Sequence, residues 1–519
     1  MNTNSRSYNS SRNLIMSIVQ KVVSILLTFV SRQIFLKVLT VEYLGINGLF
    51  VNILSMLSLA DLGLATAMSY SFYKPLAEKD EYKLAALIGF YKKVYNIIAI
   101  VVATAGLALT PFLRHIINLE NEIRYIEIYY LIALSNTVVS YLFVYKATII
   151  SADQNSSIVT KYGVWIAISG TILQIITLLT VGSYMLYSSV SILWTFAYNI
   201  MLSRKAGKLY PFIKRKEKLR SEDKRDIFNN IKSIFIYKVS GVIYNGTDSI
   251  FISALISTAI VGKLDNYGLA VSNLSAIAFI IFTSLTPSIG NLIATESPEK
   301  RMQVFKIMQT ASYWLAGFFC FCLFFLMDDF VILWLGREFI FDIATKVVIL
   351  LNFYLTITLY PIIAFREATG IYQKTKYVMV AAAALKITLS VTLGIYFGLT
   401  GIISSTIISK LLTYAWYEPK VLFRDFLGGR AITYLFGHLQ NLVMLSGCTA
   451  LAFFLFPWKE SSGWLAWILK GAVYTLSINA VYFLRYFKSP EFRDITSKIT
   501  RLVMDVLKPT ANGKGNSAV

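Results

Sequence analysis

Residues 307–327, IMQTASYWLAGFFCFCLFFLM, run without a charged side chain over the length that an α-helix needs to cross a bilayer. Such runs do not alternate in polarity and do not stop near ten residues, as barrel strands would. Backbone amides in lipid must be paired within the chain, so the runs predict an all-α polytopic membrane protein with about fourteen transmembrane helices. The predicted spans are 13–38, 44–68, 84–113, 125–150, 158–182, 184–203, 233–258, 267–294, 303–327, 342–366, 377–397, 399–417, 438–456 and 462–486.

The composition of the 519-residue chain supports a membrane protein. Hydrophobic residues make up 56% of it and charged residues 15%, and a soluble protein could not keep that much apolar surface out of water. The net charge of +21 would suggest a nucleic-acid partner in a soluble protein. Here cytoplasmic loops rich in Lys and Arg explain it, so no nucleic acid is expected. The first apolar run is too long for a signal peptide and predicts a retained helix.

Lys and Arg are distributed unevenly between alternate loops. If the N-terminus is cytoplasmic, the inward segments hold most of them, above all the basic segment 204–232. The positive-inside rule then predicts cytoplasmic N- and C-termini and an even number of helices. Segment 204–232 is interpreted as a linker that fixes topology, or as a site for anionic membrane lipids. The outward segments hold only Arg114, Arg124, Lys263, Arg337 and Lys459.

The two sides of segment 204–232 share short matches at nearly constant separation. They suggest a duplicated six-helix unit, and an even number of helices gives two repeats of the same orientation around a central cavity. This arrangement favours a transporter over a receptor or an enzyme. The matches pair Lys21 with Lys238, Gly48-Leu49 with Gly268-Leu269, and Thr160-Lys161-Tyr162 with Thr375-Lys376-Tyr377.

The expected domains follow from this duplication. Each lobe contains six helices, and two further helices stand outside the repeat. We expect an N-terminal lobe at 1–203, a basic cytoplasmic linker at 204–232, a C-terminal lobe at 233–430, two additional transmembrane helices at 431–488 and a cytoplasmic tail at 489–519.

Charged residues inside the predicted spans are the candidate functional residues. Each costs about 2.5 to 3.5 kcal/mol at the centre of a membrane helix, so it is expected to face protein or water. Cations outnumber acids among them, and an anionic cargo that enters a low-dielectric cavity needs cations to replace its lost hydration. We therefore predict that an anionic substrate is bound by Lys21, Arg32, Lys146, Lys238, Arg366, Lys386 and Lys410.

Some intramembrane charges have simpler interpretations. Lys37 and Lys470 are assigned to lipid headgroups and excluded from the site. Asp61 and Asp248 are predicted either to couple transport to an ion or only to balance neighbouring cations. Four residues near predicted cytoplasmic ends could also reach headgroups by snorkelling, namely Lys146, Asp153, Arg366 and Glu367.

The sequence carries no sign of catalytic chemistry. Its two histidines are far apart, and no metal-ligand spacing, nucleophile elbow or phosphate loop is found. The three cysteines lie in apolar runs, which favours core packing over disulfides or metal binding. We expect no catalytic residue, no metal and no cofactor. Tyrosines within spans could stack on sugar rings or pack in the core, among them Tyr70, Tyr73, Tyr244 and Tyr360.

The stretch 32–80 resembles the start of bacterial polysaccharide-export flippases, the Wzx-type members of the multidrug/oligosaccharidyl-lipid/polysaccharide (MOP) exporter superfamily. The resemblance rests on YLGINGLF at 43–50 and on the Asp-Leu-Gly-Leu motif at 61–64. A basic residue that leads into a polar turn at 146–155, echoed at 366–374, also fits. The specific sequence motifs lie mostly within the first 80 residues, although the topology agrees over the whole chain.

The resemblance implies a MATE-like, V-shaped pair of six-helix lobes with a cationic lumen. It implies movement of an undecaprenyl-diphosphate-linked oligosaccharide, for O-antigen, capsule or exopolysaccharide, across the bacterial inner membrane. The two extra helices look like those of lipid II flippases, where they help to form a groove for the lipid tail. Polysaccharide polymerase and chain-length proteins are the partners that such a pathway implies.

Other functions stay open at this point. A cation-coupled multidrug exporter of the same superfamily would need a dominant buried acid, and a lipid II-type flippase would share the two extra helices. A membrane-embedded polysaccharide polymerase or transferase would need a large outer loop or a clustered His/Asp/Arg site, and the outer loops here are short. A non-catalytic scaffold would not need a duplicated plan that forms a cavity.

Overall fold

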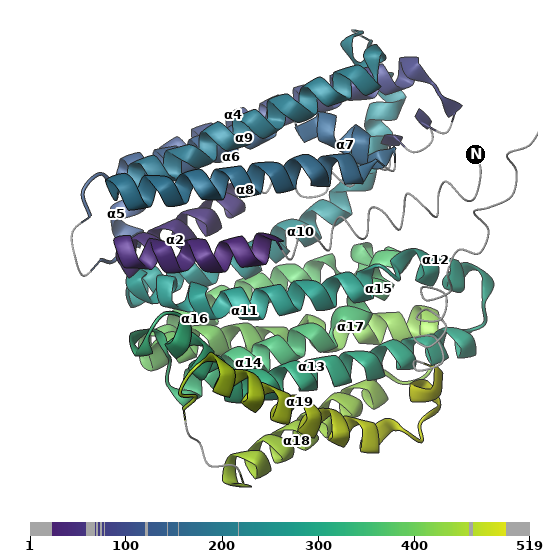
Figure 1. The fold of residues 1–519 in the computed structure, drawn as a ribbon. Coiled ribbons are helices and arrows are strands. Elements are labelled where there is room, and N and C mark those ends of the chain that lie inside the picture. The colour runs from purple at the N-terminus through teal and green to yellow at the C-terminus, as the bar shows by residue number, and fades with distance from the viewer. Residues whose placement is uncertain are drawn as a thin grey trace, which may run out of the picture. The chain divides into compact units, whose positions relative to one another are not determined.

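The computed structural model describes residues 23–58, 68, 71–72, 75–76, 78–119, 123–142, 144–153, 155–215, 217–455 and 460–494. Throughout these residues the regular secondary structure is helical (Figure 1). Contacts gather the chain into two compact units. Unit 1 comprises Met1–Leu269 and Thr375–Ser409, and unit 2 comprises Ala270–Lys374 and Lys410–Val519.

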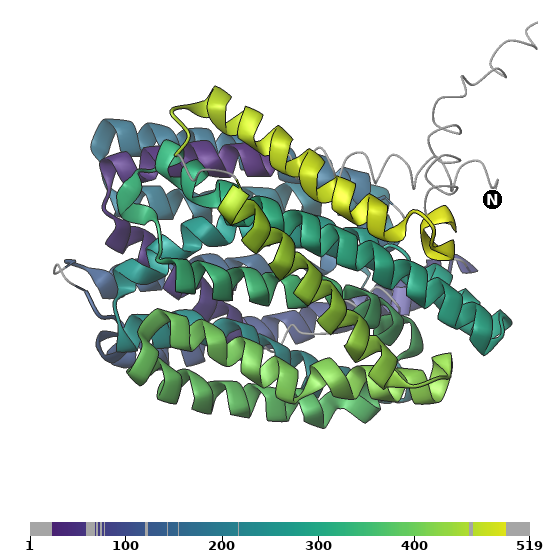
Figure 2. The same cartoon turned by 90° about the horizontal axis from the view of Figure 1, so that it is seen from below.

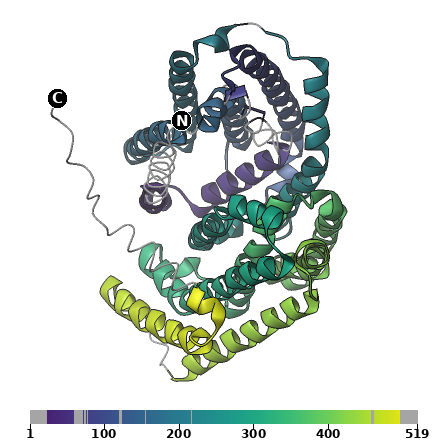
Figure 3. The same cartoon turned by 90° about the vertical axis from the view of Figure 1, so that its right-hand side faces the viewer.

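Unit 1 is a bundle of long helices around a core of buried Ile, Leu, Phe and Tyr side chains. Helix α8 lies along α9, α9 along α6 and α6 along α4, while α2 packs against α6 and α10. Figure 1 shows α4, α6, α8 and α9 running side by side, and in Figure 3 several helices of this unit are seen close to end-on. The bounds are α2 Val41–Leu57, α4 Glu81–Leu109, α5 Leu113–Ile116, α6 Ile126–Tyr141, α7 Val144–Ala152, α8 Ser156–Val181, α9 Tyr184–Leu209 and α10 Ser221–Leu255.

Glycines of the YLGINGLF segment allow the start of α11 (Thr258–Thr283) to lie directly on α2. A Cβ on Gly45 would stand 1.9 Å from the carbonyl oxygen of Thr258, and a Cβ on Gly262 would stand 2.6 Å from that of Val41. Any side chain at these positions would push the helices apart. The motif is therefore explained by the close helix packing that small residues permit in membranes.

Unit 2 is organised around the long helix α13. Helices α14, α18 and α19 all pack on α13, and α15 contacts α12 and α17. Figure 2 shows α18 and α19, in yellow-green and yellow, on either side of α13. The Trp314 indole N–H donates to Asn479 Oδ1 over 2.7 Å, which joins α13 to α19. The bounds are α12 Thr286–Thr295, α13 Pro298–Trp334, α14 Ile343–Thr358, α15 Tyr360–Thr369, α17 Tyr414–Leu422, α18 Ala431–Leu455 and α19 Trp464–Tyr486.

Helix α16 (Tyr372–Leu412) contains two of the predicted spans. Gly398 interrupts it with a φ of 57° and a ψ of −136°, a backbone conformation that glycine adopts without steric cost. The predicted boundary between 397 and 399 therefore coincides with this break. The glycine lets the chain bend sharply without a connecting loop.

Two helices extend beyond the apolar runs that the sequence predicts. Helix α11 begins at Thr258, whereas the sequence predicts a span only from 267. Lys263 and Asp265 interrupt the apolar run, but α11 accommodates Asp265 against Gly48 of α2 rather than in lipid. The basic segment 204–232 is also largely helical, because α9 continues to Leu209 and α10 begins at Ser221.

The all-helical membrane fold of about fourteen helices is confirmed. Of the described residues, nine helices are long and apolar enough to cross a membrane, or up to ten if α6 and α7 form one bent span. Three of the other four predicted spans are not counted among these for specific reasons, and the fourth is the span on α10. Helix α2 has 17 residues, α16 merges two spans, and the first helix is described only from residue 23.

Candidate functional site

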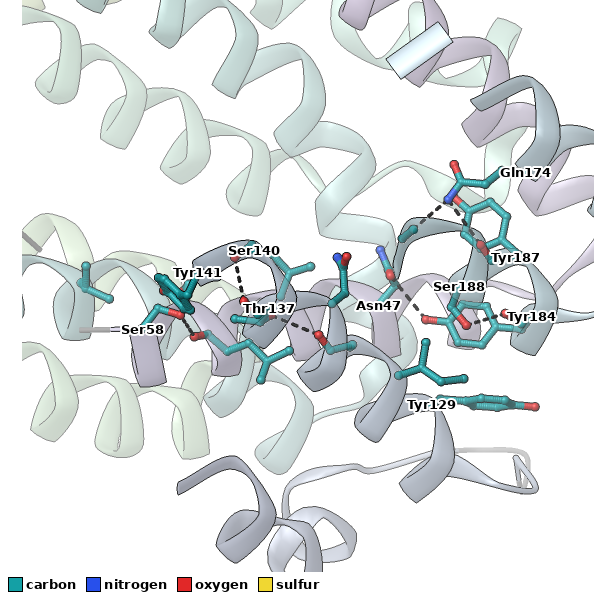
Figure 4. A pocket seen from close by; sticks show the side chains of 18 residues that line it. Asn47, Ser58, Tyr129, Thr137, Ser140, Tyr141, Gln174, Tyr184, Tyr187 and Ser188 are labelled. Atoms are coloured by element: carbon teal, nitrogen blue, oxygen red, sulfur yellow. Dashed lines mark hydrogen bonds between the residues drawn. The ribbon is translucent and has the colours of Figure 1, made fainter. Parts of the chain in front are cut away.

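Unit 1 contains a cavity of about 690 Å³ between α2, α6, α8, α9 and α10 (Figure 4). Its volume is typical of pockets that bind organic ligands. Thirteen of its 18 lining residues are polar, and none of the 18 is charged. The polar lining residues are Asn47, Ser55, Ser58, Tyr129, Asn136, Thr137, Ser140, Tyr141, Gln174, Tyr184, Tyr187, Ser188 and Ser191.

These side chains reach the cavity because they recur at helical spacing. On α6 the lining positions are 129, 132, 133, 136, 137, 140 and 141, and on α9 they are 184, 187, 188 and 191. Steps of three and four place such residues on one face of a helix. Each helix therefore turns a polar stripe inward while its remaining surface stays apolar.

Hydrogen bonds hold part of this lining in place. The Tyr184 hydroxyl donates to Asn47 Oδ1 over 3.3 Å, and Gln174 Nε2 donates to Ser191 Oγ over 3.0 Å. Asn136 Oδ1 accepts a hydrogen bond from Thr195 Oγ1 over 2.7 Å. Figure 4 shows the labelled side chains arriving from several helices around one space.

Arg32 lies on the first helix, beside the cavity but outside its lining. Its charge acts on Tyr187, which lines the cavity, and on Asp265 of α11. Asp265 in turn lies against Gly48, where a Cβ would stand 2.1 Å from the carboxylate. Arg32 Nη1 is buried and has no hydrogen-bond partner among the described residues. The sequence prediction missed Asp265, because it placed this residue in a loop.

Lys386 and Asp248 form an ion pair in unit 1, in which the lysine is buried and the carboxylate is partly exposed. Lys386 is 1% exposed, and its Nζ lies 2.9 Å from Asp248 Oδ1. It also donates to the Tyr244 carbonyl and lies over the Tyr244 ring, 4.6 Å from the centroid. Asp248 Oδ2 accepts from Thr406 Oγ1. The structure thus brings together two predicted site residues of opposite charge, which joins α10 to α16.

The predicted cations of unit 2 are held by different partners. Arg366 is buried and its Nη1 lies 3.0 and 3.2 Å from the two carboxylate oxygens of Glu418. Lys410 is also buried, and its Nζ donates to Asn352 Oδ1 and Thr356 Oγ1, each over 2.9 Å. Arg366 therefore stabilises the contact between α15 and α17, while Lys410 joins α16 to α14.

The remaining predicted residues are scattered or lie outside the described residues. In unit 1, Lys146 of α7 donates to Ser203 Oγ of α9 over 2.5 Å, and Lys238 is half-buried on α10. Lys21 and Asp61 lie outside the described residues. None of the predicted candidates that the structure describes is among the lining of the unit 1 cavity.

Lys470 was wrongly assigned to lipid headgroups. Its Nζ lies 2.7 Å from Asp329 Oδ2, and that carboxylate also accepts from the Ser461 hydroxyl. Burial of both charges makes the pair a protein contact between α13 and α19. A second pair that the sequence did not reveal joins Lys346 of α14 to Asp328 of α13 over 2.5 Å.

The span tyrosines that the structure describes are part of helix packing. Tyr244 is 2% exposed and donates to the Thr406 carbonyl, and Tyr360 is 6% exposed and donates to the Ser275 carbonyl. Neither lines the cavity. Tyr70 and Tyr73 lie outside the described residues. The cavity tyrosines come instead from α6 and α9.

Unit 2 contains an apolar groove of about 460 Å³ between α13, α14 and α18. We call it the unit 2 groove. Apart from Ser446 and Thr449 of α18 and the Tyr354 hydroxyl, its lining is hydrocarbon, aromatic ring and the Cys320 thiol. The residues that line it are Cys320, Phe324, Ile343, Val347, Leu350, Leu351, Tyr354, Leu442, Leu445, Ser446, Thr449, Ala450, Phe453 and Phe454.

Comparisons with known proteins show which solved structures share this fold. No protein-family model and no curated protein sequence matches the chain. The solved structure of the lipid II flippase MurJ in an inward closed conformation is similar over 92% of this chain and 99% of that chain, at 14% identity and a TM-score of 0.63. An inward-facing multidrug resistance MATE family transporter of the MOP superfamily covers 82% and 95%, at 13% identity and a TM-score of 0.57.

A third similar structure is a MOP superfamily transporter from Pyrococcus furiosus whose binding pocket is described as having reverse polarity. It covers 85% of this chain and 96% of that chain, at 12% identity and a TM-score of 0.52. At these identities the likeness shows the fold alone. The chain is a multi-pass membrane protein with the fold of MOP superfamily transporters, as its first 80 residues implied. Both inward-facing and outward-facing conformations of that fold are among the similar structures.

Proposed function

We propose that the protein is a flippase that moves undecaprenyl-diphosphate-linked oligosaccharide repeat units across the cytoplasmic membrane by alternating access. The observation that carries the proposal is the unit 2 groove. An amphiphile with a long hydrocarbon tail needs an apolar surface that follows its headgroup through the bilayer, whereas a soluble drug does not.

The groove has the composition that a prenyl chain requires. Phe324, Val347, Leu350 and Phe453 expose hydrocarbon to it, so a tail there loses no hydrogen bonds and gains close contacts. One wall is α18, which lies beyond the twelve helices of the predicted repeat. MurJ, a flippase of the lipid called lipid II, has a structure that is similar over 92% of the chain.

Buried cations are proposed to receive the diphosphate. Arg32 has a buried Nη1 without a hydrogen-bond partner among the described residues, and a phosphate oxygen would satisfy it. Lys410 is held by the neutral oxygens of Asn352 and Thr356, which a phosphate oxygen could replace. Lys21, Lys146, Lys238, Arg366 and Lys386 complete the proposed cationic set, with Asp61 and Asp248 proposed to couple transport to an ion.

The test is a strain that lacks the gene. We expect lipid-linked oligosaccharide to accumulate on the cytoplasmic leaflet, and the purified protein in proteoliposomes to flip the extracted material. A Lys21→Ala/Lys238→Ala/Lys410→Ala variant should abolish flipping at an unchanged level of membrane protein. Lys37→Ala is the matched control, because Lys37 is exposed. Cation-driven export of drugs with no accumulation of lipid-linked sugar would overturn the proposal in favour of a multidrug exporter.

A further inference from the structure

We infer that the unit 1 cavity binds the glycan part of the cargo, and that this glycan is uncharged. The inference rests on the proposed function and deepens it by naming the class of sugar. It differs from the expectation of a cationic lumen, because the described residues that line the unit 1 cavity offer hydroxyls, amides and aromatic rings rather than charges.

The lining can form many weak hydrogen bonds without demanding a charge. Ser140 and Ser188 donate to carbonyls of their own helices, so their oxygens still present acceptor lone pairs. Asn136 and Gln174 each carry both donors and acceptors. Asn136 accepts one hydrogen bond through Oδ1 and Gln174 donates two through Nε2, so the other atom of each amide keeps capacity for a ligand. Sugar hydroxyls are themselves donors and acceptors, so this mixed lining matches them.

The tyrosines supply flat apolar surfaces among these polar groups. Tyr129 and Tyr184 meet edge to face with ring centroids 4.9 Å apart, and Tyr184 stacks on Tyr187. The C–H face of a pyranose ring packs well on an aromatic face, while its equatorial hydroxyls point sideways to hydrogen-bonding partners. An alternation of tyrosine with serine and amide side chains along α6 and α9 therefore fits a saccharide better than a purely apolar ligand.

Among the residues that the structure describes, the charged side chains of unit 1 do not line this cavity. Arg32 interacts electrostatically with Tyr187 and Asp265 but is not a lining residue. Lys386 is paired with Asp248 and is not a lining residue. A uronic acid or an amino sugar in the cavity would bury an unpaired charge, which costs far more free energy than burying a hydroxyl. The cavity should therefore select against charged sugars.

The first experiment identifies the cargo directly. Lipid-linked oligosaccharide that accumulates in the deletion strain is extracted, and mass spectrometry determines its glycan. We expect hexoses, deoxyhexoses or N-acetylated sugars without carboxylates or free amines. A glycan that contains a uronic or sialic acid would overturn the inference while leaving the flippase proposal intact. If no lipid-linked sugar accumulates, the proposed function itself fails.

The second experiment places the sugar in the cavity. Ser188→Phe fills the lining from α9, whereas Ser189→Phe alters the next residue, which does not line the cavity. In proteoliposomes that contain the extracted cargo, we expect Ser188→Phe to slow flipping by at least about tenfold, the effect of about 1.4 kcal/mol. Ser189→Phe should leave the rate within about twofold. Equal rates for the two variants would overturn the assignment.

A less disruptive substitution controls for misfolding of the Phe variants. Gln174→Leu removes the amide from α8 at similar volume, and Thr180→Val changes a residue of the same helix outside the cavity. We expect Gln174→Leu to weaken cargo flipping while flipping of undecaprenyl diphosphate without sugar is unchanged. Loss of both activities would indicate a general defect and would count against a glycan contact. Thr180→Val should flip both cargos at the wild-type rate.

Discussion

The unit 1 cavity and the unit 2 groove differ in chemistry more than in size. The cavity has about 690 Å³ and is lined mainly by hydroxyl, amide and tyrosine side chains, whereas the groove has about 460 Å³ and is lined mainly by hydrocarbon. A single drug-like ligand would not need both surfaces. The proposed cargo, a molecule with a sugar headgroup and a prenyl tail, would use both surfaces.

The two regions are alike in that the described residues lining them are uncharged. Neither lining includes a charged side chain among the described residues, and each unit contains ion pairs outside its lining, such as Lys386 with Asp248 and Lys470 with Asp329. Buried pairs of this kind add little net stability, but the loss of one partner leaves the other charge unpaired.

The largest effect is expected when the Lys386–Asp248 pair is broken. Lys386→Met leaves the partly exposed Asp248 carboxylate without its cation, and the free energy of unfolding should fall by about 3 kcal/mol, the lower end of the range for a broken buried pair. Thermal unfolding of the purified protein in detergent, together with its yield from the membrane, measures this loss. Unit 1 should be the part that loses protection from hydrogen exchange.

A double variant separates charge from packing. Lys386→Met/Asp248→Asn removes both charges and keeps an oxygen that can accept from Thr406, so it should recover most of the lost stability. If the double variant is as unstable as Lys386→Met, the pair is not the source of the effect. The pairing of Lys386 with Asp248 would then not explain why these two charged residues are absent from the cavity lining.

Gly45→Ala is expected to have the next largest effect. Its Cβ would stand 1.9 Å from the Thr258 carbonyl oxygen, so α2 or α11 must shift, which typically costs about 1–3 kcal/mol. Because α2 supplies Asn47 and Ser55 to the cavity, flipping should fall as well, while the unit 2 groove is unaffected. Melting temperature and flipping rate measure both consequences.

Gly268→Ala is the matched control on α11. No atom lies within 4 Å of a Cβ at Gly268, so the substitution should be neutral or should stabilise by up to about 1 kcal/mol. The sequence pairs Gly48-Leu49 with Gly268-Leu269 as a repeat, yet the structure gives these glycines different surroundings. A Cβ at Gly48 would meet the Asp265 carboxylate. Equal losses at Gly45 and Gly268 would contradict the packing argument.

The fold was largely predictable because span length and apolar composition are imposed by the bilayer. Every predicted run that the structure describes contains helix, and the break at Gly398 falls at a predicted boundary. Errors arose where polar residues face protein instead of lipid. Asp265 ended a predicted span although Gly48 makes room for it, and Lys470 was assigned to headgroups although Asp329 pairs with it.

The cavity was not predictable by a search for charges. The candidate residues, such as Lys386 and Lys410, were chosen because a charged side chain is costly in lipid. The described lining of the cavity is uncharged, so this criterion could not identify Asn136 or Gln174. The available signal was periodic. Polar residues at 129, 136, 137 and 140 fall on one face of an otherwise apolar helix, and those at 184, 187, 188 and 191 do the same. A search for such stripes would have found both walls.

The smallest expected effect tests the unit 2 groove. Ala450→Trp places an indole among the groove residues of α18, whereas Leu451→Trp adds the same bulk at a position that is 60% exposed and outside the groove. Transmembrane helices accept tryptophan on lipid-facing surfaces, so both variants should fold. We expect Ala450→Trp to slow flipping of a full-length prenyl cargo several-fold while a short-chain analogue is spared, because only the long tail competes with the indole. If flipping of the full-length and the short-chain cargo slows equally, the groove supports the fold and does not guide the tail. The contrast between the two regions would then no longer support an amphiphilic cargo.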